Sequence, residues 1–317
     1  MDQTLKLSPI TSVATFLTEG ELVAFNAGPD GLIYLVIALK PLDYTTEQQG
    51  WAVFPKTRPD LPQKYRVISL SGDKIVLDIL IEDESFNIHD VQPLADDLLL
   101  VCARSHYGGE GDSEKNGRVY TRDGKFTRAI LLGDGIQTVQ TTSDGRIWTS
   151  FFDEVIFGNF GWQEPVGASG LVAWDSDGSK LYEFQPTEGL EAICDCYALN
   201  VESDEDVWFY YYTQFPLVHL HRGEIKAFWD MPVGGSDAFA VSGGRALFRG
   251  GYKEPGVFYL FELRGDEDVR MIKKINLRDQ NNNDLTAQRV VGRADAIHFI
   301  SEGYLYRLDV ESASEGS

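Results

Sequence analysis

Hydrophobic and polar residues alternate with a period of two in short runs along this chain, and tight polar turns separate the runs. The clearest case spans residues 133–184. There the runs TVQTT and RIWTS flank the turn Ser143–Gly145, and the runs GLVAW and KLYEF flank the turn Asp175–Gly178. Alternating runs around Asp-Gly turns are typical of β-hairpins. Two consecutive hairpins therefore predict one four-stranded antiparallel unit.

Looser copies of this unit recur along the chain at intervals of about 53 residues, close to the roughly 40 to 50 residues of a propeller blade. Their first turns lie near residues 30, 96, 144, 205, 243 and 294. No long amphipathic helical period interrupts them. We therefore predict an all-β fold, a six-bladed β-propeller. The alternative is a seven-bladed propeller, because residues 40–64 could contain further strands.

The two ends of the repeat series are incomplete in complementary ways. The last unit lacks a fourth strand, and the segment Ser12–Leu17 (SVATFL) has strand composition but no partner in the first unit. Pairing this N-terminal strand with the last blade would close the ring and remove exposed sheet edges. We expect a single propeller domain over residues 1–310, followed by a disordered tail over residues 311–317.

Loop lengths distinguish the two sides of such a propeller. The turns inside the hairpins are tight, whereas the connections at the other ends of the strands are long. We call the second set the long-loop side, and it contains Lys40–Lys64, Arg104–Gly117, Phe151–Ser169, Thr213–Pro216 and Gly251–Gly256. Long irregular loops on a rigid scaffold are where binding residues usually lie. The sequence thus predicts a binding surface on the long-loop side.

Charge narrows the classes of partner. The chain has 28 basic and 49 acidic residues, a net charge of −21, which argues against binding a nucleic-acid backbone or an anionic membrane surface.

Neither a secretory signal nor an apolar run of ~18 to 20 residues is visible. Cys102, Cys194 and Cys196 form no disulfide framework. We expect reduced thiols and a cytoplasmic location.

Carboxylates precede the first strands of several blades, where they would converge on the central channel. Asp90, Asp195 and Asp237 could together bind a hard cation such as Ca²⁺ or Mg²⁺, or raise one another's pKa and supply a general acid or base. The alternative is structural, because Asp side chains commonly accept hydrogen bonds from strand-end amides.

Aromatic residues gather in two of the long loops. We predict a ligand pocket where the loops of blades three and four meet, with aromatic walls and a polar rim. Its candidate residues are Phe152, Asp153, Asn159, Phe160, Trp162, Tyr211 and Tyr212. The alternative is that the loop folds back and packs its own rings, or that the rings belong to the core between blades.

The runs TTSDGRIWTSFF and GLVAWDSDGSKLYEF resemble the blades of the SMP-30/gluconolactonase, NHL and virginiamycin B lyase-like propellers. The phrases DEVIFGNFGW, CDCYALNV and WFYYYTQFPL are similar to an uncharacterised group of bacterial propellers over most of residues 85–260. The gluconolactonase resemblance implies a divalent ion held in the channel by Glu, Asn and Asp. Asp90, Asp195 and Asp237 match the Asp positions, whereas the Glu of the first blade and an Asn pair are missing.

Two functional hypotheses follow. The first is a non-catalytic propeller that binds a protein, peptide or small ligand on its long-loop side. The second is a metal-dependent hydrolase or lyase of the SMP-30/gluconolactonase type acting at the channel mouth. Because no catalytic motif is complete, the first is favoured, and whether the chain is an enzyme stays open at this point.

Overall fold

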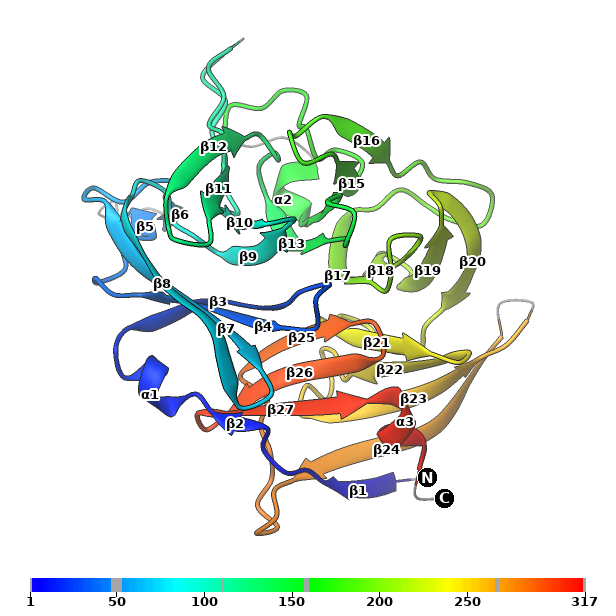
Figure 1. Ribbon diagram of the computed structural model, residues 1–317. Helices are drawn as coiled ribbons and strands as arrows, with labels where there is room; N and C mark the ends of the chain where they lie inside the picture. Colours follow the sequence, from blue (N-terminus) through cyan, green and yellow to red (C-terminus); the bar gives the residue numbers. More distant parts are fainter. Residues whose placement is uncertain (1, 47–52, 110, 157–159, 266–267, 316–317) are drawn as a thin grey trace. The chain divides into compact units, whose positions relative to one another are not determined.

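A computed structural model describes residues 2–46, 53–109, 111–156, 160–265 and 268–315. The fold is all-β and has the six four-stranded blades that the sequence predicts. The chain divides into two compact units of three blades each, residues 15–184 and residues 1–14 with 185–317. Figure 1 labels the strands of each unit. None of the helices described has the length and apolar character that a membrane crossing requires.

Residues 15–184 contain blades one to three, each an antiparallel meander of consecutive strands. Blade one consists of β3 (Glu21–Ala27), β4 (Ile33–Ala38), β7 (Gln63–Ser71) and β8 (Lys74–Glu84). Blade two consists of β9 (Asp90–Leu94), β10 (Asp97–Val101), β11 (Gly117–Thr121) and β12 (Phe126–Ile130). Blade three consists of β13 (Ile136–Thr141), β14 (Ile147–Phe151), β15 (Leu171–Trp174) and β16 (Lys180–Glu183).

The other unit contains blades four to six and both ends of the chain. Blade four consists of β17 (Asp195–Val201), β18 (Asp206–Tyr212), β19 (Pro216–His221) and β20 (Glu224–Asp230). Blade five consists of β21 (Phe239–Ser242), β22 (Arg245–Arg249), β23 (Val257–Leu263) and β24 (Val269–Arg278). Blade six has three strands of its own, β25 (Arg289–Arg293), β26 (Ala296–Ser301) and β27 (Tyr304–Asp309).

The N-terminal segment completes the last blade, as the sequence predicts. Strand β2 (Thr11–Ser12) pairs antiparallel with β27, with Thr11 opposite Leu305. Of the expected segment Ser12–Leu17 only the first residue is paired, because Ala14–Leu17 forms the helical turn α1. A second N-terminal strand, β1 (Asp2–Lys6), adds in parallel to the outer edge of blade five beside β24 (Figure 1).

One alternative is excluded and one expectation is corrected. Before β7 begins at Gln63, the described part of the segment 40–64 contains only a two-stranded ribbon, β5 (Thr45–Thr46) with β6 (Phe54–Pro55), so the sheets described form six blades and not seven. The tail expected to be disordered forms helix α3 (Val310–Ser314), because Asp309 caps it by accepting the Ser312 amide at 2.7 Å and because Ala313 is buried. Residues 316–317 lie outside the described part.

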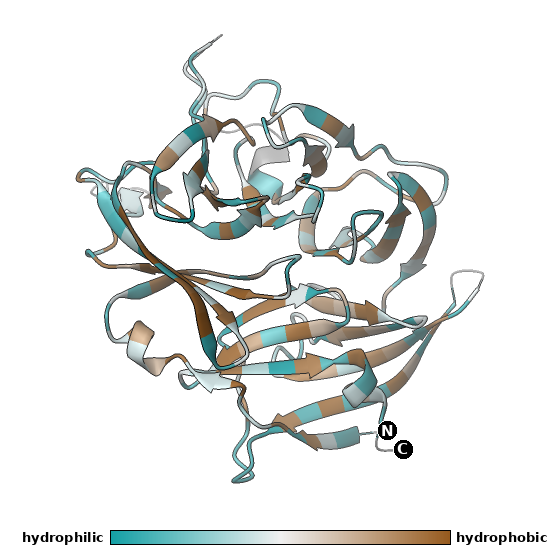
Figure 2. Ribbon diagram, viewed as in Figure 1, coloured by the Kyte–Doolittle hydropathy of each residue, from teal (hydrophilic) through white to brown (hydrophobic). Residues whose placement is uncertain are grey.

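The hydrophobic core of each unit lies between neighbouring blades. Figure 2 shows hydrophobic positions recurring along the strands, and β4 is buried over its whole length. Separate clusters fill the spaces between blades one and two, two and three, four and five, and five and six. Facing sheets with alternating side chains bury one face of each blade against the next. The strands therefore form a scaffold from which the long loops project.

In each unit a buried asparagine on the first strand of one blade hydrogen-bonds to the backbone of another blade. In one unit Asn26 on β3 donates to the carbonyl of Val139 on β13 at 2.9 Å. In the other unit Asn200 on β17 donates to the carbonyl of Phe239 at 3.0 Å and accepts the Ala294 amide at 2.7 Å. Because an amide side chain both donates and accepts, one residue satisfies backbone groups that the sheets leave unpaired.

Candidate functional site

Asp90 lies at the start of β9, where the sequence predicts it, and its carboxylate is held by three N–H groups. It accepts from Asn26 Nδ2 at 2.7 Å, from its neighbour's amide (Val91) at 2.7 Å, and from the Val139 amide at 2.9 Å. Burial raises the pKa of Asp90 to about 6, although these donors favour the charged form. The carboxylate therefore links the first strands of blades one, two and three.

This elevated pKa predicts a pH dependence of stability. Since the folded pKa of about 6 lies above the ordinary value of 3.8, the folded state binds the Asp90 proton more tightly than the unfolded state. The contribution of Asp90 to stability is fully present below pH 4 and is lost as the pH rises through 6, on the order of 2 to 3 kcal/mol. In urea unfolding, Asp90→Asn should therefore destabilise the protein more at pH 4.5 than at pH 7. A difference between variant and wild type that is the same at both pH values would contradict this.

The other two candidate metal ligands belong to the second unit. Asp195 is half-buried at the start of β17, and Asp237 is exposed just before β21. The Asp237 carboxylate pairs with Arg249 Nη1 at 2.6 Å. Within the described residues no three His, Cys, Asp or Glu side chains come together as a metal site. A Ca²⁺ or Mg²⁺ site built from Asp90, Asp195 and Asp237 stays a prediction from the sequence.

The loop Phe151–Ser169 of blade three is called the blade-three insert. Its Trp162 packs on the loop that follows β10 of blade two. Its side chain is only 8% exposed, and its indole N–H donates to the carbonyl of Ser105 at 2.8 Å. Its ring lies 4.8 Å from that of Tyr107. The Tyr107 amide in turn donates to the carbonyl of Phe160 at 3.0 Å. The contacts of Trp162 match the alternative of a loop packed against its neighbour.

Arg104, on the loop after β10, also contacts the loop Phe151–Ser169. Its Nε and Nη2 donate to the two oxygens of Asp134 at 2.9 and 3.1 Å, and Nη1 donates to Glu154 at 3.3 Å. The guanidinium carbon lies 4.2 Å from the ring centre of Phe160 and 5.4 Å from that of Phe152. Arg104 and Asp134 are both buried, and burial raises the pKa of Asp134 despite the arginine beside it.

Two further residues of the predicted pocket belong to this insert. Asp153 is exposed at the start of α2 (Asp153–Ile156) and accepts the amide of Glu154 at 2.7 Å. Asn159 lies outside the described residues. The structure thus brings Phe152 and Phe160 together around Arg104, places Trp162 beneath the neighbouring loop, and leaves Asp153 facing solvent.

The two tyrosines predicted in blade four have different surroundings. Tyr211 is buried, and its hydroxyl donates to the carbonyl of Glu191 at 2.9 Å. Tyr212 is 43% exposed, and its ring lies edge-on to Phe215 at 5.6 Å. Phe215, with a left-handed φ of 60°, is the centre of an aromatic cluster that also includes Tyr197, Tyr210 and Tyr252. Tyr212 therefore belongs to a larger aromatic surface of this unit.

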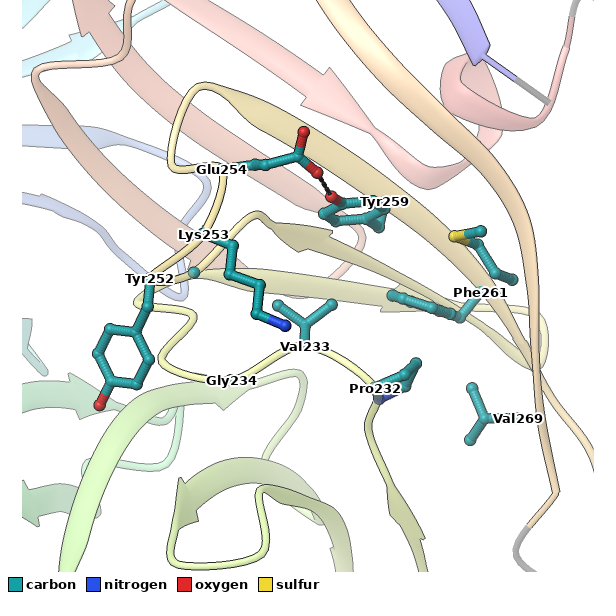
Figure 3. A pocket seen from close by; sticks show the side chains of 11 residues that line it. Pro232, Val233, Gly234, Tyr252, Lys253, Glu254, Tyr259, Phe261 and Val269 are labelled. Atoms are coloured by element: carbon teal, nitrogen blue, oxygen red, sulfur yellow. Dashed lines mark hydrogen bonds between the residues drawn. The ribbon is translucent and has the colours of Figure 1, made fainter.

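A pocket of about 460 Å³ opens beside this cluster on blade five. Its walls come from the β20–β21 connection, the β22–β23 loop and the outer strands β23 and β24 (Figure 3). They are mostly apolar. The lining residues are Pro232, Val233, Gly234, Gly251, Tyr252, Lys253, Glu254, Tyr259, Phe261, Val269 and Met271.

The register of blade five explains why these segments meet. Phe239 on β21 is opposite Phe248 on β22, so the connection into β21 and the loop out of β22 leave the sheet at the same end. That end is the long-loop side. Gly251 allows the two segments to touch, because a Cβ there would lie 1.9 Å from the carbonyl oxygen of Gly234. The pocket therefore forms where a long-loop segment crosses the connection from blade four.

The two charged side chains of the pocket, Glu254 and Lys253, differ in whether a neighbouring group neutralises them. Glu254 is already neutralised, since its carboxylate pairs with Lys274 Nζ at 2.5 Å and accepts the Tyr259 hydroxyl. Lys253 has no hydrogen-bond or ion-pair partner within the described part of the chain. Figure 3 shows its side chain extending toward Val233 while the Phe261 ring points toward the same space. An apolar pocket with one uncompensated ammonium group results.

Sequence reasoning identified the loop Gly251–Gly256 as part of the long-loop side but named none of the pocket residues. The available signals were a tyrosine and a lysine inside that loop, and the exposed apolar Met271 on an outer strand. These residues lie close to Pro232 and Phe261 only because the strand register brings separate segments together.

Residues 170–308 match the model of the YxzG family, an uncharacterised family. No curated protein matches the chain. Among solved structures, the chain is similar to a gluconolactonase from Xanthomonas campestris at 12% identity, with a TM-score of 0.42 and coverage of 78% of this chain and 82% of that one. It is also similar to the WD40 β-propeller domain of Doa1 at 9% identity, with a TM-score of 0.42 and coverage of 91% and 92%. The fold assignment itself rests on the sheet topology.

Proposed function

We propose that this protein is a binding propeller whose blade-five pocket holds a small, largely apolar molecule bearing an anionic group. The observation that supports this proposal is the mostly apolar pocket of about 460 Å³ with a single uncompensated ammonium group at Lys253. Ligand sites typically have about 300 to 1,000 Å³, apolar walls and a few placed polar groups. The pocket also lies on the long-loop side, where the sequence predicts binding.

The walls suit a flat apolar group. Val269 and Met271 supply hydrophobic and polarisable contacts over the buried Phe261, and Tyr252, 65% exposed, stands at the margin. Burying apolar ligand surface against such walls contributes roughly 25 cal/mol per Å² before the cost of association is subtracted. Apolar contact therefore supplies most of the affinity in this proposal.

The charge supports an anionic rather than a cationic ligand. The Glu254 carboxylate is satisfied by Lys274 and Tyr259, so it offers no free acceptor to a cation. The Lys253 ammonium group has three N–H donors, and the oxygens of a carboxylate or sulfonate would accept hydrogen bonds from them. In a chain of net charge −21, this local ammonium would favour an anion at short range only.

Substitution of Met271 tests the apolar wall. The fluorescent probe 8-anilinonaphthalene-1-sulfonate combines a flat apolar body with one anionic group, and we expect it to bind with saturation. Met271→Glu should weaken this binding by about tenfold or more, because it places a carboxylate in the pocket wall. Fluorescence titration measures the effect. The matched control is Leu181→Glu on β16, which is similarly exposed (55% against 53%) and lies outside the pocket; equal affinity for the two variants would contradict the proposal.

Replacement of Lys253 tests the anionic preference separately. Lys253→Met keeps an apolar stem but removes the ammonium group, so we expect weaker binding of the sulfonate probe by a factor of about 5 to 10. The neutral probe N-phenyl-1-naphthylamine should bind wild type and variant alike, and its titration serves as the control. Loss of both probes, or of neither, would count against a charge-specific role for Lys253.

We also propose a cytoplasmic location. Cys102 and Cys196 are buried and Cys194 is half-buried, and all three are free thiols. Burial raises the pKa of the Cys102 thiol to about 12, which keeps it protonated and unreactive. Free thiols persist in reducing compartments. Fractionation of the source cells would test this location directly.

A further inference from the structure

A second hollow, of about 260 Å³, lies in the other unit and differs from the blade-five pocket in its chemistry. It is polar and carries three cationic side chains. Its lining residues are Arg58, Phe86, Asp112, Ser113, Glu114, Lys115 and Arg118. They come from the segment 40–64, the connection between blades one and two, the loop after β10, and strand β11. Two of these four segments, residues 40–64 and the loop after β10, belong to the long-loop side.

The Nε–H groups of Arg58 and Arg118 each donate to a carboxylate, which holds the two side chains in place. Arg58 Nε donates to Glu114 Oε1 at 2.7 Å, and Arg118 Nε donates to both oxygens of Glu84 at 3.2 Å. Each guanidinium also stacks on Phe86, with its carbon 4.1 Å (Arg58) or 4.9 Å (Arg118) from the ring centre. These contacts hold two flexible side chains in one arrangement before any ligand arrives, which reduces the entropic cost of binding.

The same contacts leave the terminal nitrogens of Arg58 without a carboxylate partner, whereas Arg118 also interacts with the Tyr120 hydroxyl. Arg58 Nη1 reaches only the hydroxyl of Ser85, at 3.5 Å, and no terminal nitrogen of Arg58 or Arg118 hydrogen-bonds a carboxylate among the described residues. Guanidinium groups recognise planar or tetrahedral oxyanions through pairs of such nitrogens. Arg58 and Arg118 both line the hollow, so they supply donors of this kind to it.

Three carboxylates accompany the three cationic side chains: Asp112 and Glu114 line the hollow, and Glu84 pairs with Arg118. Glu114 accepts from Arg58 through one oxygen and from the His106 amide through the other, and its pKa is lowered. Asp112 and Lys115 also line the hollow, so its cations and the carboxylates beside them are equal in number. Preference for an oxyanion then depends on the terminal guanidinium nitrogens as hydrogen-bond donors and not on net charge.

We propose that this hollow binds a phosphate group, either as inorganic phosphate or as the terminal group of a small phosphomonoester. Phosphate carries about −1.5 to −2 charges near neutral pH and several strong acceptor oxygens, which match the nitrogens of Arg58 and Arg118. Lys115 supplies a third cation at the edge of the hollow. The proposal does not depend on the blade-five pocket, because different residues of a different unit carry it.

The test is isothermal titration calorimetry at low ionic strength with inorganic phosphate and, separately, with glycerol 3-phosphate. Wild type should bind at least one of them with saturation. Arg58→Met should weaken that binding by about tenfold or more. The matched control is Arg222→Met, which removes an exposed, singly paired arginine from blade four and should leave binding unchanged.

The two titrants distinguish the source of the phosphate. Binding of inorganic phosphate alone assigns the free anion, and equal or tighter binding of glycerol 3-phosphate assigns a phosphomonoester. Arg58 is the first choice for substitution because it is about half exposed, whereas Arg118 contacts the buried Glu84 and its loss endangers folding. Lys115→Met is the second variant, expected to weaken binding less than Arg58→Met. No saturable binding by wild type, or equal binding by Arg58→Met and Arg222→Met, would overturn the proposal.

Discussion

Asp134→Asn is expected to lower the free energy of unfolding by about 3 kcal/mol, because it leaves the buried Arg104 without its main counter-ion. Asp134 is fully buried and accepts two N–H groups of Arg104 and the amide of Ser105. Asparagine keeps the shape but turns one acceptor oxygen into a donor that faces the guanidinium. Urea unfolding at pH 7 measures the loss.

The partner carboxylate provides the control. Glu154 is 59% exposed and lies 3.3 Å from Arg104 Nη1, so Glu154→Gln should cost less than about 1 kcal/mol. Adding Arg104→Met to Asp134→Asn should recover part of the stability, since the unpaired buried charge is then gone. Equal losses for Asp134→Asn and Glu154→Gln would show that the buried pair does not hold the loops as described.

Trp162→Ala is expected to cost about 3 kcal/mol or more, within the range seen when a large buried aromatic is truncated. The indole is 8% exposed, donates to the Ser105 carbonyl and packs on Tyr107. Trp162→Phe keeps most of the packing and loses the hydrogen bond, so its cost should be about 1 kcal/mol beyond the change in size. Thermal unfolding, followed by circular dichroism, ranks wild type, Trp162→Phe and Trp162→Ala by stability.

A ligand-contacting role for Trp162 gives a different result. If the insert were an open pocket, Trp162→Ala would leave stability near wild type, like Leu61→Ala, whose side chain is 79% exposed. It would also abolish binding of the sulfonate probe. We expect the reverse on both counts, with stability reduced and probe binding retained by the folded variant, because the blade-five pocket belongs to a different unit.

The hairpins were predictable from sequence because their signals are local. The turns ending at Gly145 and Gly178 have φ near +87° and +86°, which glycine adopts without strain, and the flanking runs alternate. The parallel pairing of β1 with β24 had no such signal, since its partners are about 270 residues apart. Helix α3 was missed because its small and polar residues resemble a disordered tail, although Asp309 caps it.

The site was less predictable than the scaffold for the same reason. Sequence placed Phe160 and Trp162 on a long loop but gave no sign that Arg104 and Ser105, more than 50 residues earlier, would cover them. The blade-five pocket combines residues from 232 to 271 whose proximity depends on strand register. Loop length predicted which side of the blades would carry the pocket, and tertiary packing decided which residues line it.

The most direct test of the blade-five binding site is methyl NMR of ¹³C-methionine-labelled protein during titration with 8-anilinonaphthalene-1-sulfonate. The chain has three methionines, and Met271 lines the pocket. A Met271→Leu variant assigns its signal. We expect the Met271 methyl resonance to shift with saturation, in step with the rise in probe fluorescence. Fluorescence that saturates while the Met271 methyl resonance stays unshifted would place the bound probe elsewhere and contradict a binding site on blade five.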